Sequence, residues 1–179
     1  MGQLLDSPIH EDRLLAVILL AERAKKADAA ECERVYRFYL RKRRRINNWD
    51  LIDTSAPYVV GPMLDGPART AVDKLSRSAR LWDRRIAILA HQYEIKRGRV
   101  QPFLAFAPRF LDDSEDLIHK AVGWMLRECG DQDRAKLERF LERHAGRMPR
   151  TMLRYAIEKL DPAERAKYLR APRRERKRC

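Results

Sequence analysis

A segment of unusual composition runs from Ile46 to Pro57, with the sequence Ile-Asn-Asn-Trp-Asp-Leu-Ile-Asp-Thr-Ser-Ala-Pro. Trp49 and Asp53 are four residues apart, so a helix would place them on one face, where an aromatic plane and a carboxylate can reach the same ligand. Asp50 falls in the first turn, where the helix dipole explains an acidic residue. The pair alone is a weak signal, because a Trp usually packs in a core and an Asp is usually the partner of an Arg.

Pro57 should bend the helix that carries this pair. It has no N–H to donate to the carbonyl of Asp53, four residues earlier, so local order should be disturbed at the carboxylate. An apolar stripe takes the core side of the same segment: Ile52, Ala56, Val59, Val60 and Met63. Trp49 and Asp53 are therefore expected near the edge of the buried face.

The rest of the chain is predicted to be helical, because apolar residues recur at helical spacing and no strand pattern is found. The predicted helices span residues 11–26, 30–45, 49–55 with a continuation after Pro57 to 64, 68–78, 81–97, 100–111, 115–129, 132–146, 149–159 and 161–169. Caps and stops support these boundaries. They are Asn47-Asn48 before Trp49, Asp112-Asp113-Ser114 before Glu115, Gly130-Asp131 between two helices, and Asp161-Pro162 at the start of the last helix.

A weak internal repeat links three of the predicted helices. Each has a basic residue followed by small and apolar positions, beginning at Arg85, Lys120 and Arg154. A period of this size built from helix pairs is typical of an α-solenoid, so we predict an all-α fold of HEAT-like repeats stacked in a curved α-solenoid. The three basic residues would then form a track for a phosphate backbone on one surface, or they are ordinary solvated residues beside a core seam.

Composition favours one globular domain with an anionic partner. The chain has 179 residues, of which 45% are apolar, and 39 Lys and Arg against 26 Asp and Glu give a formal net charge of +13. A single domain is expected over residues 1–170 and a disordered basic tail over 171–179. The basic run 41–45 closes a helix, and both a solvated helix terminus and a nucleic-acid contact fit it.

Several classes of protein are disfavoured. The sequence has no membrane span and no signal peptide, so we expect a soluble, cytoplasmic protein. Cys32, Cys129 and Cys179 lie far apart without metal-ligand spacing, and the four histidines are isolated from one another. We therefore expect no disulfide framework and no metal site.

Four segments together carry a more specific signal: Ile46–Asp53, Leu81–Leu89, His119–Glu128 and Met148–Glu158. The residues of these segments, their order and the distances between them in sequence resemble those of the HEAT-like-repeat alkylpurine DNA glycosylases, the AlkD family of DNA alkylation repair enzymes. The resemblance extends from about Asp12 to Leu169. Family members usually have further helices before the segment that matches Asp12, whereas eleven residues precede it here, so we expect a shortened DNA-binding surface.

The resemblance implies a site and a reaction. Asp53 matches the catalytic aspartate of the family, Trp49 and Trp124 match the two tryptophans that flank the lesion nucleotide, and Arg85 matches an arginine that holds the DNA backbone. The implied reaction is hydrolysis of the N-glycosidic bond of 3-methyladenine and 7-methylguanine in duplex DNA, by a monomer, without full base flipping and without a cofactor. Lys120 and Arg154 are further predicted phosphate contacts.

Two other classes of function remain open. A non-catalytic HEAT-like module could bind DNA or a protein through the same surface, and retention of Asp53, Trp49 and Trp124 together argues against it. An RNA-binding helical repeat would need base-reading residues at matched positions, which the sequence lacks.

Overall fold

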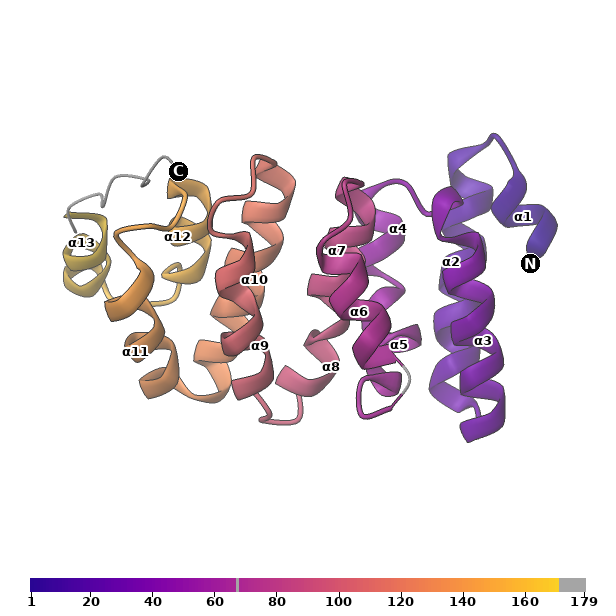
Figure 1. Cartoon of the computed structure of the whole chain (residues 1–179), viewed down its shortest axis with the longest axis horizontal. Coiled ribbons are helices and arrows are strands. Elements are labelled where there is room, and N and C mark those ends of the chain that lie inside the picture. The colour runs from indigo at the N-terminus through magenta and orange to yellow at the C-terminus, as the bar shows by residue number, and fades with distance from the viewer. Residues whose placement is uncertain (67, 171–179) are drawn as a thin grey trace. The chain divides into compact units, whose positions relative to one another are not determined.

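The computed structural model describes residues 1–66 and 68–170, and every regular element in this part of the chain is a helix (Figure 1). The predicted fold class, an all-α stack of HEAT-like helix pairs, is confirmed. The chain divides into two compact units, Met1–Tyr93 and Glu94–Cys179. The single domain over 1–170 stays a prediction, and the basic tail predicted for 171–179 lies outside the described residues.

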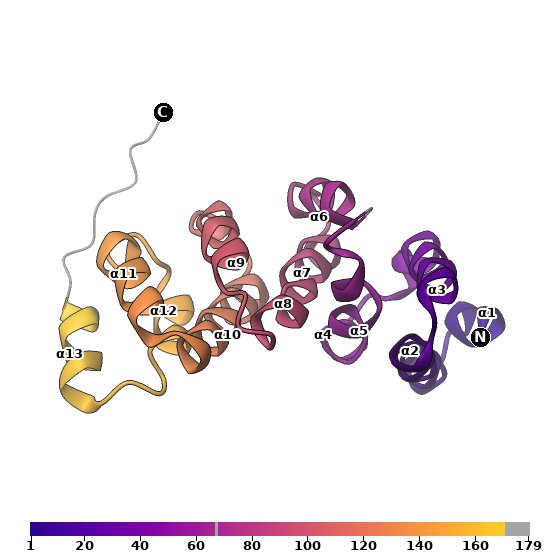
Figure 2. The ribbon, with the colours of Figure 1, turned by 90° about the horizontal axis from the view of Figure 1, so that it is seen from below.

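The first unit holds two layers of helices. Its elements are α1 (Gly2–Asp6), α2 (His10–Lys26), α3 (Ala29–Lys42), the 3-10 turn η1 (Arg43–Arg45), α4 (Trp49–Asp53), α5 (Ala56–Val59), the 3-10 turn η2 (Gly61–Met63), α6 (Ala68–Ser76) and α7 (Leu81–Ala90). Helices α2, α4 and α7 follow one another in one layer, and α3 and α6 lie in the other (Figure 2). The short α1 was not predicted, because five residues are too few to show helical periodicity.

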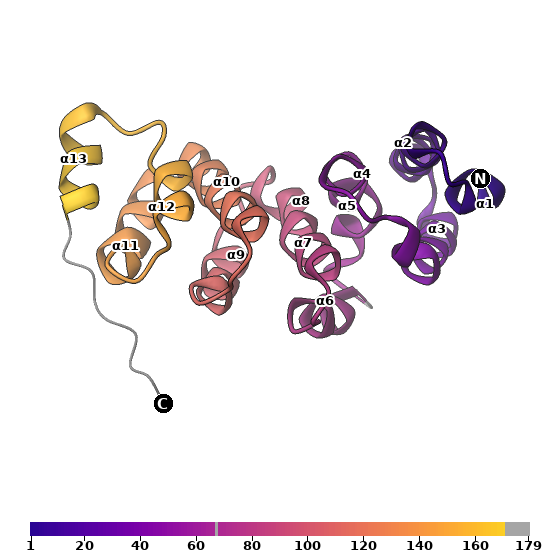
Figure 3. The same ribbon diagram turned by 90° about the horizontal axis from the view of Figure 1, so that it is seen from above.

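The second unit repeats this arrangement. The boundary between the units falls within α8 (Gln92–Ile95), which is followed by α9 (Gln101–Phe106), the 3-10 turn η3 (Ala107–Phe110), α10 (Asp116–Gln132), α11 (Arg134–His144), α12 (Arg150–Ala156) and α13 (Pro162–Arg170). Helices α10 and α12 pack closely in one layer, and α9 and α11 form the other (Figure 3). In the described part of the chain, the predicted helix boundaries are mostly correct to within a few residues.

The helix predicted over residues 81–97 is interrupted at His91. The imidazole is buried, and its Nδ1 lies 2.9 Å from the carbonyl oxygen of Ala87, one turn earlier. The chain resumes as the single turn α8. Because no Gly or Pro stands at the break, the apolar periodicity predicted one continuous helix where the structure has two.

The helix stop predicted at Gly130-Asp131 is wrong. Helix α10 continues through Gly130 to Gln132, and the break falls at Asp133, whose carboxylate caps α11 by accepting a hydrogen bond from the backbone N–H of Lys136. A Cβ on Gly130 would stand 2.5 Å from a methyl carbon of Leu137 in α11. Gly130 therefore lies against Leu137 of the next helix, and it does not end α10.

Candidate functional site

The local structure of α4 follows from its flanking residues. The Asn48 side chain accepts a hydrogen bond from the backbone N–H of Trp49, which confirms the predicted cap. The helix ends at Asp53, and Pro57 lies in the first turn of the separate helix α5. The predicted bend is thus a complete break, and it leaves Asp53 in the last turn of a helix of five residues.

Asp53 is held by Arg85 of α7. The Arg85 guanidinium donates from Nε to Oδ1 of Asp53 at 2.8 Å and from Nη2 to Oδ2 at 2.7 Å, which is a bidentate ion pair. The Asp53 side chain is 15% exposed and that of Arg85 is 6% exposed. The two planar groups therefore fix each other in one orientation at the margin of the core.

Opposing effects act on the pKa of the Asp53 carboxyl. Burial raises it above the usual range of an aspartate, and it is the largest influence. The hydrogen bonds and the positive charge of Arg85 lower it, while the nearby carboxylate of Asp50 raises it further. Arg85 is therefore the group that favours the ionised form of Asp53 in a site that burial makes unfavourable for charge.

Trp49 begins the same helix and is 51% exposed, so it is not a core residue. The predicted spacing of Trp49 and Asp53 on one helix is confirmed, and the structure adds the arginine on the neighbouring helix. An aromatic surface open to solvent and an oriented carboxylate are thus presented by one short element.

Two further contacts position α4 from other helices. The Tyr39 hydroxyl of α3 lies 2.9 Å from Oγ of Ser55, two residues after Asp53, and both side chains are buried. In addition, Nε2 of His10 in α2 lies 2.6 Å from Oδ2 of Asp50. The sequence shows His10 only as one of four isolated histidines, and it gives no signal for Tyr39 or Ser55, because none of these pairings has a local spacing pattern.

Trp124 lies in α10 of the second unit and is half-buried. Its indole Nε1 donates to Oε1 of Glu128, one turn later, at 3.1 Å, and Glu128 is also paired with Lys96. Gly123 beside it lets α12 approach closely, since a Cβ there would stand 2.5 Å from the carbonyl oxygen of Met152. The orientation of Trp124 thus depends on the α10–α12 contact and on a carboxylate.

Comparison with known proteins identifies the family. Residues 1–160 match the family described as "DNA alkylation repair enzyme". The chain belongs to this family. No curated protein and no solved structure matches the chain. As a member of the DNA alkylation repair enzyme family, the chain has a role in DNA repair.

The basic residues predicted to face DNA in this DNA alkylation repair family member differ from one another in environment. Arg85 is paired with Asp53, Lys120 is 41% exposed and forms an ion pair with Asp116 at 2.9 Å, and Arg154 is exposed. Arg85 is thus the most enclosed of the three. A backbone contact by each of them stays a prediction.

The basic run 41–45 is largely engaged within the first unit. Lys42 pairs with Asp6, Arg43 pairs with the buried Asp83, and Arg45 donates to three carbonyl oxygens at the end of α1. Three of the five cations therefore hold the protein together, and Arg41 and Arg44 are the exposed members. Neither a simple solvated terminus nor a run of five phosphate contacts describes this segment.

Within residues 1–66 and 68–170, no group of three His, Cys, Asp or Glu residues is placed to hold a metal ion. In the same part of the chain, no helix has both the length and the apolar composition needed to cross a membrane. The described cysteines, Cys32 and Cys129, are free thiols.

Proposed function

We propose that the chain is a DNA glycosylase that hydrolyses the N-glycosidic bond of cationic alkylated purines, 3-methyladenine and 7-methylguanine, in duplex DNA, without full base flipping. It would act as a cytoplasmic monomer in base excision repair. The observation that carries the proposal is the Asp53 carboxylate, oriented by both donors of Arg85 beside the exposed Trp49, in a member of a DNA alkylation repair family.

The proposed reaction does not require the protein to protonate the leaving base. A purine alkylated at N3 or N7 is already cationic, so the bond from C1′ to the base nitrogen breaks with its electron pair moving to the base, which departs neutral. The sugar acquires oxocarbenium character, and a water molecule adds to C1′ and releases a proton to solvent. An oriented carboxylate stabilises that sugar charge and can hold the attacking water, and these are the roles we assign to Asp53.

The two tryptophans are proposed to hold the lesion nucleotide. A cationic base or sugar over an aromatic face gains about 0.5–2 kcal/mol. Trp49 offers such a face at the start of α4, and Trp124 is the second residue proposed for this role. A surface that holds the nucleotide without enclosing it suits a lesion that remains largely stacked.

Three basic residues, Arg85, Lys120 and Arg154, are proposed to contact the DNA backbone. In the structure Arg85 orients Asp53 and favours its ionised form, and we propose that it also contacts the DNA backbone next to the lesion. Lys120 and Arg154 are proposed to contact phosphates, each adding a salt-dependent contribution to DNA affinity.

The decisive experiment is the release of 7-methylguanine from methylated duplex DNA. Asp53→Asn should lower release on the order of 10²-fold or more, as expected when an electrostatic contact to the transition state is removed. Glu11→Gln is the matched control, because it makes the same change of charge at an exposed carboxylate of α2 and should leave most of the activity. Release by Asp53→Asn at the parent rate, with fold and DNA binding intact, would contradict the proposal.

One observation favours a second candidate, a non-catalytic HEAT-like module that binds DNA or a protein. Both oxygens of Asp53 accept hydrogen bonds from Arg85, an arrangement also found in purely structural ion pairs. The same assay separates the two functions. A folded parent that binds duplex DNA and releases no base has the binding function alone.

A further inference from the structure

A basic groove lies between α9 and α11 in the second unit, with a volume of about 340 Å³. Helix α9 contributes Gln101 to its wall, and α11 contributes Lys136, Arg139, Arg143 and His144. No carboxylate is among the residues that line it, all of which the structure describes. The layer of α9 and α11 is opposite the layer of α10 and α12, which carries Trp124, Lys120 and Arg154 (Figure 3).

The basic and acidic side chains of α11 lie on different faces of the helix. At 3.6 residues per turn, Lys136, Arg139 and Arg143 fall within an arc of about 60°. On the same estimate, Glu138 and Glu142 point about 90–130° away from the middle of that arc. Glu138 accepts a hydrogen bond from Arg134 at 2.8 Å, and Arg134 also pairs with Glu164 of α13. The carboxylates of this helix are thus kept apart from the groove.

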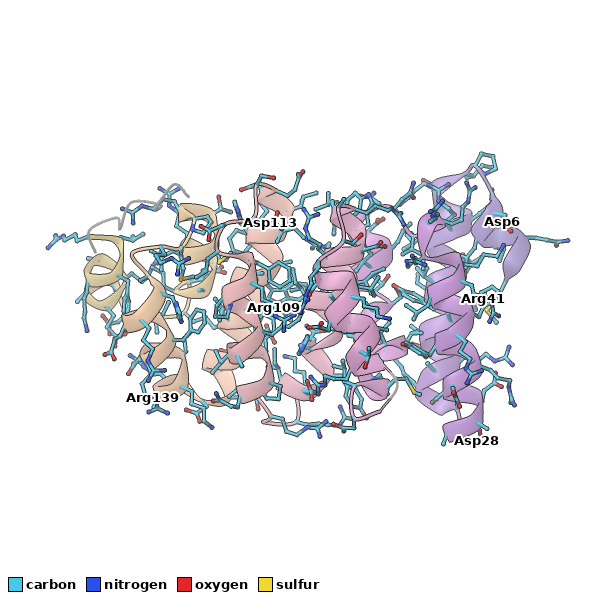
Figure 4. All side chains as sticks on the ribbon, viewed as in Figure 1. Asp6, Asp28, Arg41, Arg109, Asp113 and Arg139 are labelled. Carbon is cyan, nitrogen blue, oxygen red and sulfur yellow. The ribbon has the colours of Figure 1, made fainter. Side chains whose placement is uncertain are left out.

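Two of the groove cations are available to a ligand. Arg139 and Arg143 are exposed, and neither forms an ion pair within the described part of the chain; Figure 4 shows Arg139 at the surface of the second unit. Lys136 is paired with Asp133 at 2.7 Å, which leaves it partly engaged. Since Arg139 and Arg143 are one turn apart, their Cα atoms are separated by about 6 Å along the helix axis.

His144, which also lines the groove, is close to positively charged side chains. Burial, followed by the positive charges of Arg147 and Arg143, lowers the pKa of His144 below its usual value. Burial thus disfavours the charged imidazole most, and the two arginines add to that effect. A ligand in the groove would meet the guanidinium groups of Arg139 and Arg143, while the Asp133 carboxylate, which is paired with Lys136, is not among the lining residues.

The lining also indicates the class of ligand. Of the apolar residues that line the groove, Leu104 and Phe140 are buried, and Ala105 and Pro108 offer only small side chains to a ligand. Guanidinium groups match phosphate oxygens in geometry as well as charge. A nucleic-acid backbone therefore fits the groove better than an acidic amphipathic peptide.

We propose that the α9–α11 groove is a second DNA-contact site, with Arg139 and Arg143 binding phosphates of a duplex other than the one contacted by α10 and α12. One copy of the protein would then bridge two duplex segments. The inference rests on the DNA-binding part of the proposed function, and it is independent of catalysis.

The test is a capture assay with the full chain. A short duplex is immobilised, the protein is added, and retention of a second, fluorescent duplex is measured while base release is followed in parallel. Arg139→Gln/Arg143→Gln should lose most of the captured second duplex and keep first-duplex binding and base release. The slope of log affinity against log salt for the second duplex should fall by about 1.8 for two lost phosphate contacts.

The matched control is Arg165→Gln/Lys167→Gln, which removes two exposed cations from α13 and should capture the second duplex like the parent. Three results would overturn the inference: no capture by the parent, equal capture by the groove variant, or equal loss in the control. Displacement of the second duplex by a polyglutamate peptide as readily as by unlabelled duplex would assign the groove to acidic peptides instead. Sedimentation showing two protein copies in each bridged complex would assign bridging to a dimer.

Discussion

Gly123 and Met152 lie closer than any side chain on Gly123 would permit. A Cβ at Gly123 would stand 2.5 Å from the Met152 carbonyl oxygen and equally close to the Tyr155 Cβ, so both neighbours on α12 would have to move. Neither atom is the far end of a flexible side chain. The contact between α10 and α12 therefore requires glycine at this position, directly beside Trp124.

Replacement of this glycine is expected to destabilise the second unit. Gly123→Ala should lower the free energy of unfolding by about 1–3 kcal/mol, the usual cost of forcing extra volume into a packed contact. Urea denaturation measures the change. Gly2→Ala is the control, because nothing lies within 4 Å of the corresponding Cβ position. Equal stability of the two variants would show that α12 can shift at no cost.

The pH dependence of base release should report the Asp53 carboxyl. Because burial raises its pKa, the carboxyl takes up a proton at a higher pH than an exposed aspartate does. The ionised form is the active one, so release should fall as the pH is lowered through this raised pKa. Spontaneous base loss, measured without protein at each pH, is subtracted.

Removal of the Arg85 charge should move that acid limb to higher pH. Arg85 lowers the pKa of Asp53 by hydrogen bonding and by its charge, so Arg85→Gln leaves burial and Asp50 unopposed. The pH profile of the variant is compared with that of the parent, after circular dichroism has established that both are folded. An acid limb at the parent position would mean that another group limits the rate at low pH.

Trp49 should matter for activity far more than for stability. Because half of the residue is exposed, Trp49→Ala should change the midpoint of thermal unfolding little. Base release should fall by the equivalent of about 0.5–2 kcal/mol, the value of the lost cation–π contact. Trp49→Phe keeps an aromatic face and should retain more activity than Trp49→Ala. A large loss of stability with unchanged release would assign Trp49 a packing role.

The sequence predicted the helices and the placement of the Trp49–Asp53 pair because both depend on local spacing. The cap of α4 and a disturbance before Pro57 were predicted for the same reason, since Asn48 and Pro57 act on residues within one turn. The predicted disturbance was a bend, and the structure shows a complete break. The alternative for Asp53, partnership with an arginine, also occurs in the structure, and the partner is the residue assigned to the DNA backbone. Residue types alone could not show that Arg85 is enclosed and bonded to this carboxylate.

The remaining errors concern contacts between distant residues. Gly130 is predicted to be a stop from its neighbours in sequence, whereas in the structure it lies within α10 against Leu137 of the next helix. His10 joins Asp50 across forty positions of sequence, a pairing for which no periodic pattern exists. The three cations of the basic run that hold α1 and α7 could likewise be assigned only once those helices were placed.

The separation of Asp53 and Arg85 in sequence has a consequence for the newly synthesised chain. The two residues are 32 positions apart, and a helix of five residues is not stable on its own. The carboxylate therefore acquires its orientation only after α7 has been made and has docked against α4. A nascent chain that has not been extended past Arg85 carries Trp49 and Asp53 without a formed site between them.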